Sequence, residues 1–118
     1  MQTPHTAANS PDMHGSARAQ DAARVLETLR QELDMIDATL LETLRERLDC
    51  CCRIGQHKRD HAIPMMQPQR IGVVQQRAAA FAATHRMSPE FLRALYELVI
   101  AETCRLEDQI IGPATAAS

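Results

Sequence analysis

The most constraining feature of this sequence is a long apolar stripe with helical spacing. Between about Asp21 and about His61, apolar side chains recur every three or four residues, which is typical of one face of an α-helix. The stripe comprises Leu26, Leu29, Leu33, Ile36, Leu40, Leu44, Leu48, Cys51 and Ile54. Asp21 can cap the start of this helix, and no proline interrupts it before Pro64. The pattern therefore predicts a single helix about 60 Å long.

Two shorter helices are expected after it. Pro64 breaks the first helix, and a second runs from about Pro68 to about Thr84. Ser88 is a suitable N-cap for a third helix over Pro89–Ile111, which Gly112 ends. The fold class is therefore all-α, with three helices of which the first is very long. Residues 1–20 and 113–118 are expected to be disordered tails around a helical domain at 21–112.

The predicted helix lengths indicate that one chain cannot bury its own apolar stripe. Two short helices cannot cover an apolar stripe that runs along so long a helix, and uncovered apolar surface is unfavourable. A second copy of the chain covers the rest of the stripe if the two long helices pair antiparallel. We therefore expect a homodimer.

Composition narrows the class of protein further. Aromatic residues make up only 3% of the chain, so its core must be aliphatic, which favours helices over strands. The net charge is −2 and the pI is about 6.2, without the basic excess of a nucleic-acid-binding protein. No segment has the pattern of a membrane span or a signal peptide. We expect a cytoplasmic protein that binds neither nucleic acid nor membrane.

The cysteines and histidines do not indicate a metal site. Cys50, Cys51 and Cys52 are consecutive and point in different directions on a helix, so with Cys104 they lack metal-ligand or disulfide spacing. His57 and His61 share a face but have no evident third ligand. We expect free thiols and no metal.

Several charged side chains follow the apolar pattern closely enough to form one site. Arg47 and Lys58 are eleven residues apart, about three turns, so they share a face and lie about 16 Å apart. Arg70 begins the second helix, where the chain folds back. Thr103 and Glu107 are one turn apart on the third helix. These groups predict a buried, positively charged pocket for a small dianion, although solvated surface charges would show similar spacing.

Arg30 can join that pocket only from another chain. It precedes Arg47 by seventeen residues, about 25 Å along the same helix, which no arginine side chain spans. The alternative is that Arg30 is a solvated surface charge. Asp37 also lies within the stripe, and we interpret it as a carboxylate that fixes packing, not as a catalytic group.

With its apolar stripe and these charged residues, the chain resembles the AroQ-type chorismate mutases, all-helical enzymes of aromatic amino-acid biosynthesis in the shikimate pathway. The resemblance covers roughly Leu26 to Ile111. Its segments are LRQELDMIDATLLETLRERLD, RIGQHKRDH, QPQRI and FLRALYELVIAETCRLED. The matching motif residues are Arg30, Ile36-Asp37, Arg47, Gly55-Gln56-His57-Lys58, Arg70, Thr103 and Glu107.

The resemblance implies an intertwined homodimer that rearranges chorismate to prephenate by a pericyclic Claisen reaction without a cofactor. It implies that Arg30 of one chain and Arg47 of the other pair with the substrate carboxylates. Lys58 would contact a carboxylate and the ether oxygen, and Glu107 would face that oxygen from the other side. Glu107 can donate a hydrogen bond to the oxygen only when protonated, and the sequence leaves its protonation state open. Arg70, Thr103 and Gln67 would complete the binding site, whose catalytic residues are Lys58, Glu107 and Arg47.

At one place the chain departs from the family pattern, and this leaves the identity of the substrate undecided. Gln67 and Ile71 stand where many family members carry carboxylates for the ring hydroxyl. Chorismate is the leading prediction, and 4-amino-4-deoxychorismate or isochorismate, the latter split by a lyase, are alternatives on the same scaffold. The non-enzymatic alternative is a helical dimerisation or regulatory module.

Overall fold

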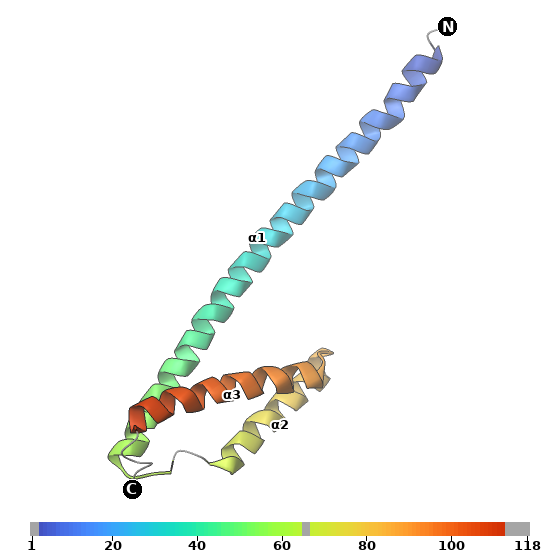
Figure 1. Cartoon of the computed structure of the whole chain (residues 1–118). Coiled ribbons are helices and arrows are strands. Elements are labelled where there is room, and N and C mark those ends of the chain that lie inside the picture. The colour runs from blue at the N-terminus through green and yellow to red at the C-terminus, as the bar shows by residue number, and fades with distance from the viewer. Residues whose placement is uncertain (1–2, 65–66, 113–118) are drawn as a thin grey trace. The chain divides into compact units, whose positions relative to one another are not determined.

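The computed structural model describes residues 3–64 and 67–112, with side chains from Gly15 onward. These residues form three helices and no strand: α1 (Thr3–Asp60), α2 (Pro68–His85) and α3 (Pro89–Ile111) (Figure 1). The all-α prediction with one very long N-terminal helix is confirmed. The chain divides into two compact units, residues 1–44 and 45–118, which are described separately below.

The helix boundaries agree with the sequence pattern except at the start of α1. Helix α3 has the predicted bounds, and α2 ends one residue later than expected, at His85. Helix α1 begins at Thr3 and not at Asp21. Alanines such as Ala17 and Ala19, upstream of Asp21, have the highest helix propensity, so the helix need not begin at the cap. The domain boundaries remain predictions, and residues 113–118 lie outside the described residues.

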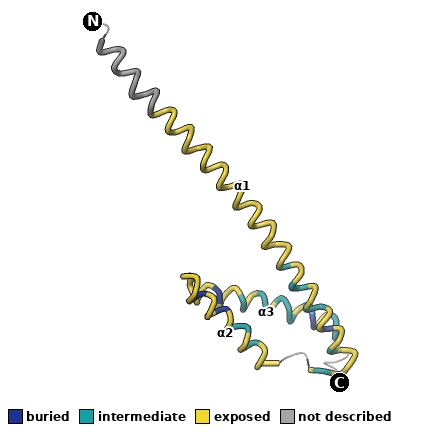
Figure 2. Tube along the Cα trace, turned by 180° about the vertical axis from the view of Figure 1, so that it is seen from behind, coloured by how far each residue is buried: buried dark blue, intermediate teal, exposed yellow. Residues whose placement is uncertain are grey.

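The first unit exposes the apolar stripe. Every described side chain from residue 15 to residue 43 is exposed (Figure 2). Leu26, Leu29, Leu33, Ile36 and Leu40 are between 47% and 58% exposed. Burying a large aliphatic side chain stabilises a fold by roughly 1.5–3 kcal/mol, so covering this stripe would add substantially to the stability of the protein. No helix within the described ranges is both long and apolar enough to cross a lipid bilayer.

The second unit is built around the pairing of α2 with α3. Ala78, Ala82 and Leu92 form its buried core, and Tyr96 packs against them. The turn between the helices is closed at Arg86, whose left-handed backbone (φ 57°) lets the Met87 amide donate to the Ala82 carbonyl at 2.9 Å. Helix α3 then begins as predicted, because the Ser88 side chain accepts a hydrogen bond from the Phe91 amide at 3.1 Å. This hairpin supplies two walls of the site described next.

Candidate active site

A cavity of about 300 Å³ in the second unit brings together six of the seven predicted substrate-binding residues. Helix α1 contributes Arg47 and Lys58, and the start of α2 contributes Gln67 and Arg70. Thr103 and Glu107 come from α3. The rest of the lining consists of apolar side chains and thiols, namely Cys51, Ile54, Ile71, Val74, Ile100 and Cys104. The lining therefore contains six of the predicted residues, and their roles remain predictions.

An ion pair lies at one end of this cavity. Lys58 Nζ lies 3.2 Å from Glu107 Oε1, and the two side chains are only 13% and 8% exposed. Both groups lose most of their hydration at this position, which costs several kcal/mol per ion unless each has a partner. The pair places an ammonium and a carboxyl group side by side where both can reach one small ligand.

Arg47 is held in place by contacts with α3. Its Nη1 donates to Thr103 Oγ1 at 3.2 Å, and Thr103 Oγ1 in turn donates to the Val99 carbonyl at 3.0 Å. The guanidinium carbon lies 5.7 Å from the centre of the Tyr96 ring, within the range of a cation–π contact. These contacts orient a planar group that can bind a carboxylate through two parallel hydrogen bonds.

The charge of the lining suits an anionic ligand. Three cations, Arg47, Lys58 and Arg70, face one carboxylate, that of Glu107, which leaves a formal excess of two positive charges. Opposite charge concentrated in a cleft with apolar walls attracts a ligand strongly. The site is therefore complementary to a small dianion.

Gln67 occupies the N-cap position of α2 with only its backbone engaged. Its carbonyl accepts from the Arg70 amide at 2.9 Å, whereas its side chain makes no capping hydrogen bond. The carboxamide can therefore both donate to and accept from a ligand in the cavity it lines.

The close approach of α1 and α3 depends on Gly55, which is buried. A Cβ atom at this position would lie 3.2 Å from Glu107 Cγ and 3.6 Å from Ile110 Cδ1. Helix interiors disfavour glycine, so its presence here has a tertiary reason. The sequence motif contains this residue, but its contact with Glu107 emerges only from the packing of the two helices.

Gly55→Ala is expected to lower activity roughly 10-fold. Glu107 is predicted to be catalytic, and displacing a catalytic group by a fraction of an ångström weakens transition-state contacts. The added methyl group pushes on Glu107 Cγ and so disturbs the pair with Lys58. The measurement is kcat/KM together with thermal unfolding. Gly72→Ala on α2 is the matched control, since a Cβ there meets nothing within 4 Å. Equal activities of the two variants would contradict this role of Gly55.

The cysteines of the cavity, Cys51 and Cys104, are free thiols. Burial, reinforced by the neighbouring Glu107 and Asp108 carboxylates, raises the pKa of the Cys104 thiol. A raised pKa keeps a thiol protonated at neutral pH, and a protonated thiol is a poor nucleophile. Cys51 and Cys104 therefore serve as small apolar wall residues.

Arg30 is not among the residues that line the cavity. It belongs to the first unit, where its side chain is exposed. That it enters the site from a second chain stays a prediction.

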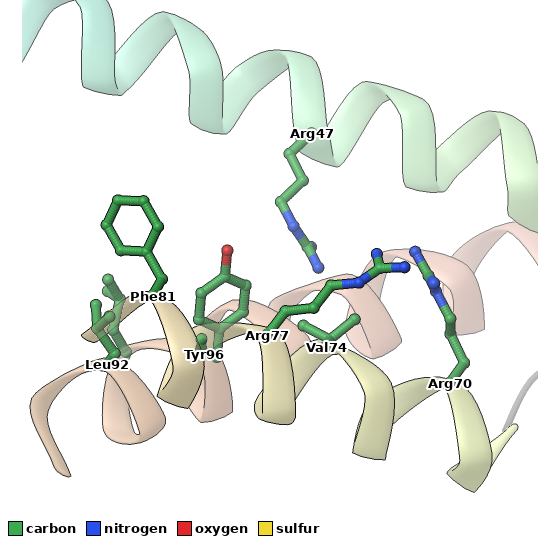
Figure 3. A pocket seen from close by; sticks show the side chains of 9 residues that line it. Arg47, Arg70, Val74, Arg77, Phe81, Leu92 and Tyr96 are labelled. Atoms are coloured by element: carbon green, nitrogen blue, oxygen red, sulfur yellow. The ribbon is translucent and has the colours of Figure 1, made fainter. Parts of the chain in front are cut away.

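Sequence reasoning missed two cavity residues, Arg77 and Tyr96. Both line a second cavity of about 500 Å³ that shares Arg47 and Arg70 with the first (Figure 3). The signal for Arg77 was its position seven residues after Arg70, on the same face of α2.

The fold and the cavity together define an all-helical protein with a cationic site for a small dianion. Residues 29–108 match the family model of chorismate mutase type II, and the chain belongs to this family. It is 49% identical over 110 residues to a 4-amino-4-deoxychorismate mutase of Streptomyces pristinaespiralis, covering 93% of this chain and 83% of the relative. It is 48% identical over 87 residues to a 4-amino-4-deoxychorismate mutase of Streptomyces venezuelae, covering 74% and 84% respectively. The chain is therefore an isomerase of the chorismate mutase type.

Proposed function

We propose that this chain catalyses the Claisen rearrangement of 4-amino-4-deoxychorismate, with chorismate as the second candidate. The observation that carries the reaction class is the convergence of six predicted residues on one cationic cavity. The amino substrate is favoured because two relatives, each almost half identical to this chain, carry that activity in their names. Chorismate is favoured by the family description.

The proposed reaction is an isomerisation. The ether C–O bond breaks while a new C–C bond forms in one cyclic step, so no atom is gained or lost. Negative charge develops on the ether oxygen as its bond lengthens. Lys58 Nζ is the donor that stabilises this oxygen, since donors fixed where charge develops favour the transition state. Glu107 Oε1, 3.2 Å from Lys58 Nζ, holds the ammonium group in place beside the oxygen.

The arginines hold the substrate in its reactive conformation. Arg47, oriented by Thr103, binds one carboxylate, and Arg30 of the partner subunit binds the other. Arg70 adds positive charge at the start of α2. Holding both carboxylates removes rotational freedom from the enolpyruvyl side chain, and such restriction lowers the barrier of an intramolecular reaction.

The homodimer is part of this proposal. The exposed stripe on residues 26–40 supports it, because a partner helix would bury side chains that the single chain leaves about half exposed. The proposed site is complete only when the partner contributes Arg30. A cytoplasmic location stays a prediction from the sequence.

Gln67 is proposed to contact the ring substituent that distinguishes the two substrates. A neutral carboxamide accepts from an amine or a hydroxyl and offers no charged acceptor to either. Selectivity built on such a contact is modest, so both compounds are expected to react, with the amino compound favoured roughly 10-fold in kcat/KM.

The substrate is tested by incubating the purified protein separately with 4-amino-4-deoxychorismate, chorismate and isochorismate. Ultraviolet absorbance follows substrate loss, and chromatography identifies the product. The proposal predicts rearranged product from the first two and no salicylate or pyruvate from the third. A higher kcat/KM for chorismate would overturn the substrate preference. Inactivity towards all three compounds would leave the dimerisation module as the explanation of the fold.

Glu107→Gln is expected to keep kcat/KM within about 10-fold of the native value, whereas Glu107→Ala is expected to lower it roughly 100-fold. Glutamine keeps an oxygen that accepts from Lys58 and adds an N–H donor for the ether oxygen, and alanine has neither. The measurement is kcat/KM, with Glu102→Ala as control because Glu102 pairs with Arg105 on the surface of the same helix. Equal kcat/KM values for Glu107→Ala and the native protein would remove Glu107 from this role.

A further inference from the structure

The second cavity, of about 500 Å³, contains an arginine that the proposed reaction does not use. Arg77 lines it together with Arg47, Arg70 and Val74, all of which also line the first cavity. Figure 3 shows the guanidinium groups of Arg70 and Arg77 beside each other, with Arg47 pointing towards the same space. The remaining lining is apolar or aromatic, and it includes no carboxylate. This cavity therefore presents positive charge beside an apolar surface.

A surface with apolar side chains and unpaired positive charge is complementary to a partner that is both apolar and acidic. Within the described residues, Arg70 and Arg77 have no ion-pair partner. Like charges that converge beside apolar side chains repel one another more strongly than they would in water. Phe81, on the apolar side of the cavity, is also 52% exposed.

The first unit has the complementary chemistry. Residues 1–44 carry seven Asp or Glu against three Arg, a net charge of −4, whereas residues 45–118 carry ten Lys or Arg against eight Asp or Glu, a net charge of +2. Asp37 lies inside the exposed apolar stripe, between Ile36 and Leu40. Among the described side chains it also has no ion-pair partner.

The spacing between two charged residues on α1 equals the spacing between two arginines on α2. Arg30 and Asp37 are seven residues apart on α1, and Arg70 and Arg77 are seven residues apart on α2. Seven residues are nearly two turns, so each pair shares a helix face and spans about 10.5 Å. In the second unit, α2 runs back against the direction of the last part of α1 (Figure 1). A partner helix antiparallel to α1 therefore runs in the same direction as α2.

We propose that Asp37 of the partner subunit forms an ion pair with Arg77, and that this pair sets the register at which Arg30 of the partner subunit enters the active site. The inference rests on the dimer in the proposed function. With Arg30 of the partner beside Arg47 and Arg70, Asp37 of the partner lies two turns further along, level with Arg77. The apolar stripe then covers the apolar part of the second cavity. Arg77 is thus a positioning residue that acts through the register of the partner helix.

Reversing the charges tests the pair directly. Arg77→Glu and Asp37→Arg each place like charges together, and each is expected to raise the dimer dissociation constant and to lower kcat/KM at least 10-fold. The double variant restores opposite charges and is expected to return both quantities to within about threefold of the native values. Sedimentation measures the dimer, and substrate loss measures kcat/KM. The control double variant pairs Asp37→Arg with Arg53→Glu, since Arg53 is exposed and lines neither cavity.

The outcomes separate this inference from the proposed function. If the native protein is an active dimer and the charge-reversed double variant is no better than the single variants, the ion pair is wrong while the function stands. If the double variant restores the dimer of a protein inactive on every chorismate-type substrate, the pair stands and the function fails. Should the reversed variants not fold, Asp37→Asn and Arg77→Gln replace them. The ion pair would then be overturned if the fold-change in the dimer dissociation constant of the double variant equals the product of the two single fold-changes. A double-variant fold-change at least threefold smaller than that product would support the pair.

Discussion

Lys58→Ala is expected to reduce kcat/KM roughly 100- to 1,000-fold, the loss typical of removing one preorganised group that stabilises developing charge. Lys58 is the only lining cation that lies within ion-pair distance of Glu107 among the described residues. The loss should appear mainly in kcat, because the proposed contact of Lys58 with the ether oxygen strengthens as the C–O bond breaks. Arg53→Ala, which removes a charge from an exposed position on the same helix, should leave activity unchanged.

Stability must be measured alongside this loss, because Lys58→Ala leaves the Glu107 carboxylate buried without its partner. Breaking a buried pair from one side costs up to about 3–5 kcal/mol. The double variant Lys58→Ala with Glu107→Gln removes the unpaired charge, so its melting temperature should rise above that of Lys58→Ala while activity stays low. A Lys58→Ala protein that is folded and retains native kcat/KM would exclude Lys58 from the reaction.

Arg30→Ala and Arg47→Ala are each expected to lower kcat/KM at least about 100-fold, since in the proposed site each removes one bidentate contact with a substrate carboxylate. The two variants should differ in stability. Arg30 is exposed within its own chain, so its truncation should change the free energy of unfolding by less than about 0.5 kcal/mol. Arg47 contacts Thr103 and the Tyr96 ring, so its truncation also removes packing.

Arg24→Ala is the matched control for Arg30→Ala. Arg24 is exposed on the same helix and pairs with Asp21. Its removal changes the net charge equally but takes nothing from the proposed site. Equal kcat/KM values for Arg24→Ala and Arg30→Ala would contradict the role of Arg30.

The fold was largely predictable because its signals are local. Helix α3 follows from Ser88 as N-cap, a proline in the first turn and Gly112 at the end, and each signal acts within a few residues. Pro68 likewise marks the start of α2. The start of α1 was not predictable from Asp21, because a good N-cap permits a helix to begin but does not prevent one from continuing upstream.

The candidate site was predictable to the extent that helix periodicity governs it. The eleven-residue interval from Arg47 to Lys58 and the four-residue interval from Thr103 to Glu107 place each pair on one face. That α1 and α3 meet at Gly55 was not predictable, since it depends on how two helices pack. The spacing of Arg77 from Arg70 places the two on one face of α2, but the cavity that Arg77 lines appears only when α2 and α3 pack with the last part of α1.

Mixed dimers of Arg30→Ala and Arg47→Ala test most directly whether two chains build each site. In a mixed dimer one site carries both substitutions and the other carries neither. If the two inactive proteins are unfolded together and refolded at equal concentration, half of the dimers are mixed, each with one intact site, so about a quarter of native activity should return. No recovery, with mixed dimers demonstrated by mass spectrometry, would contradict the claim that Arg30 and Arg47 act on the substrate from different chains.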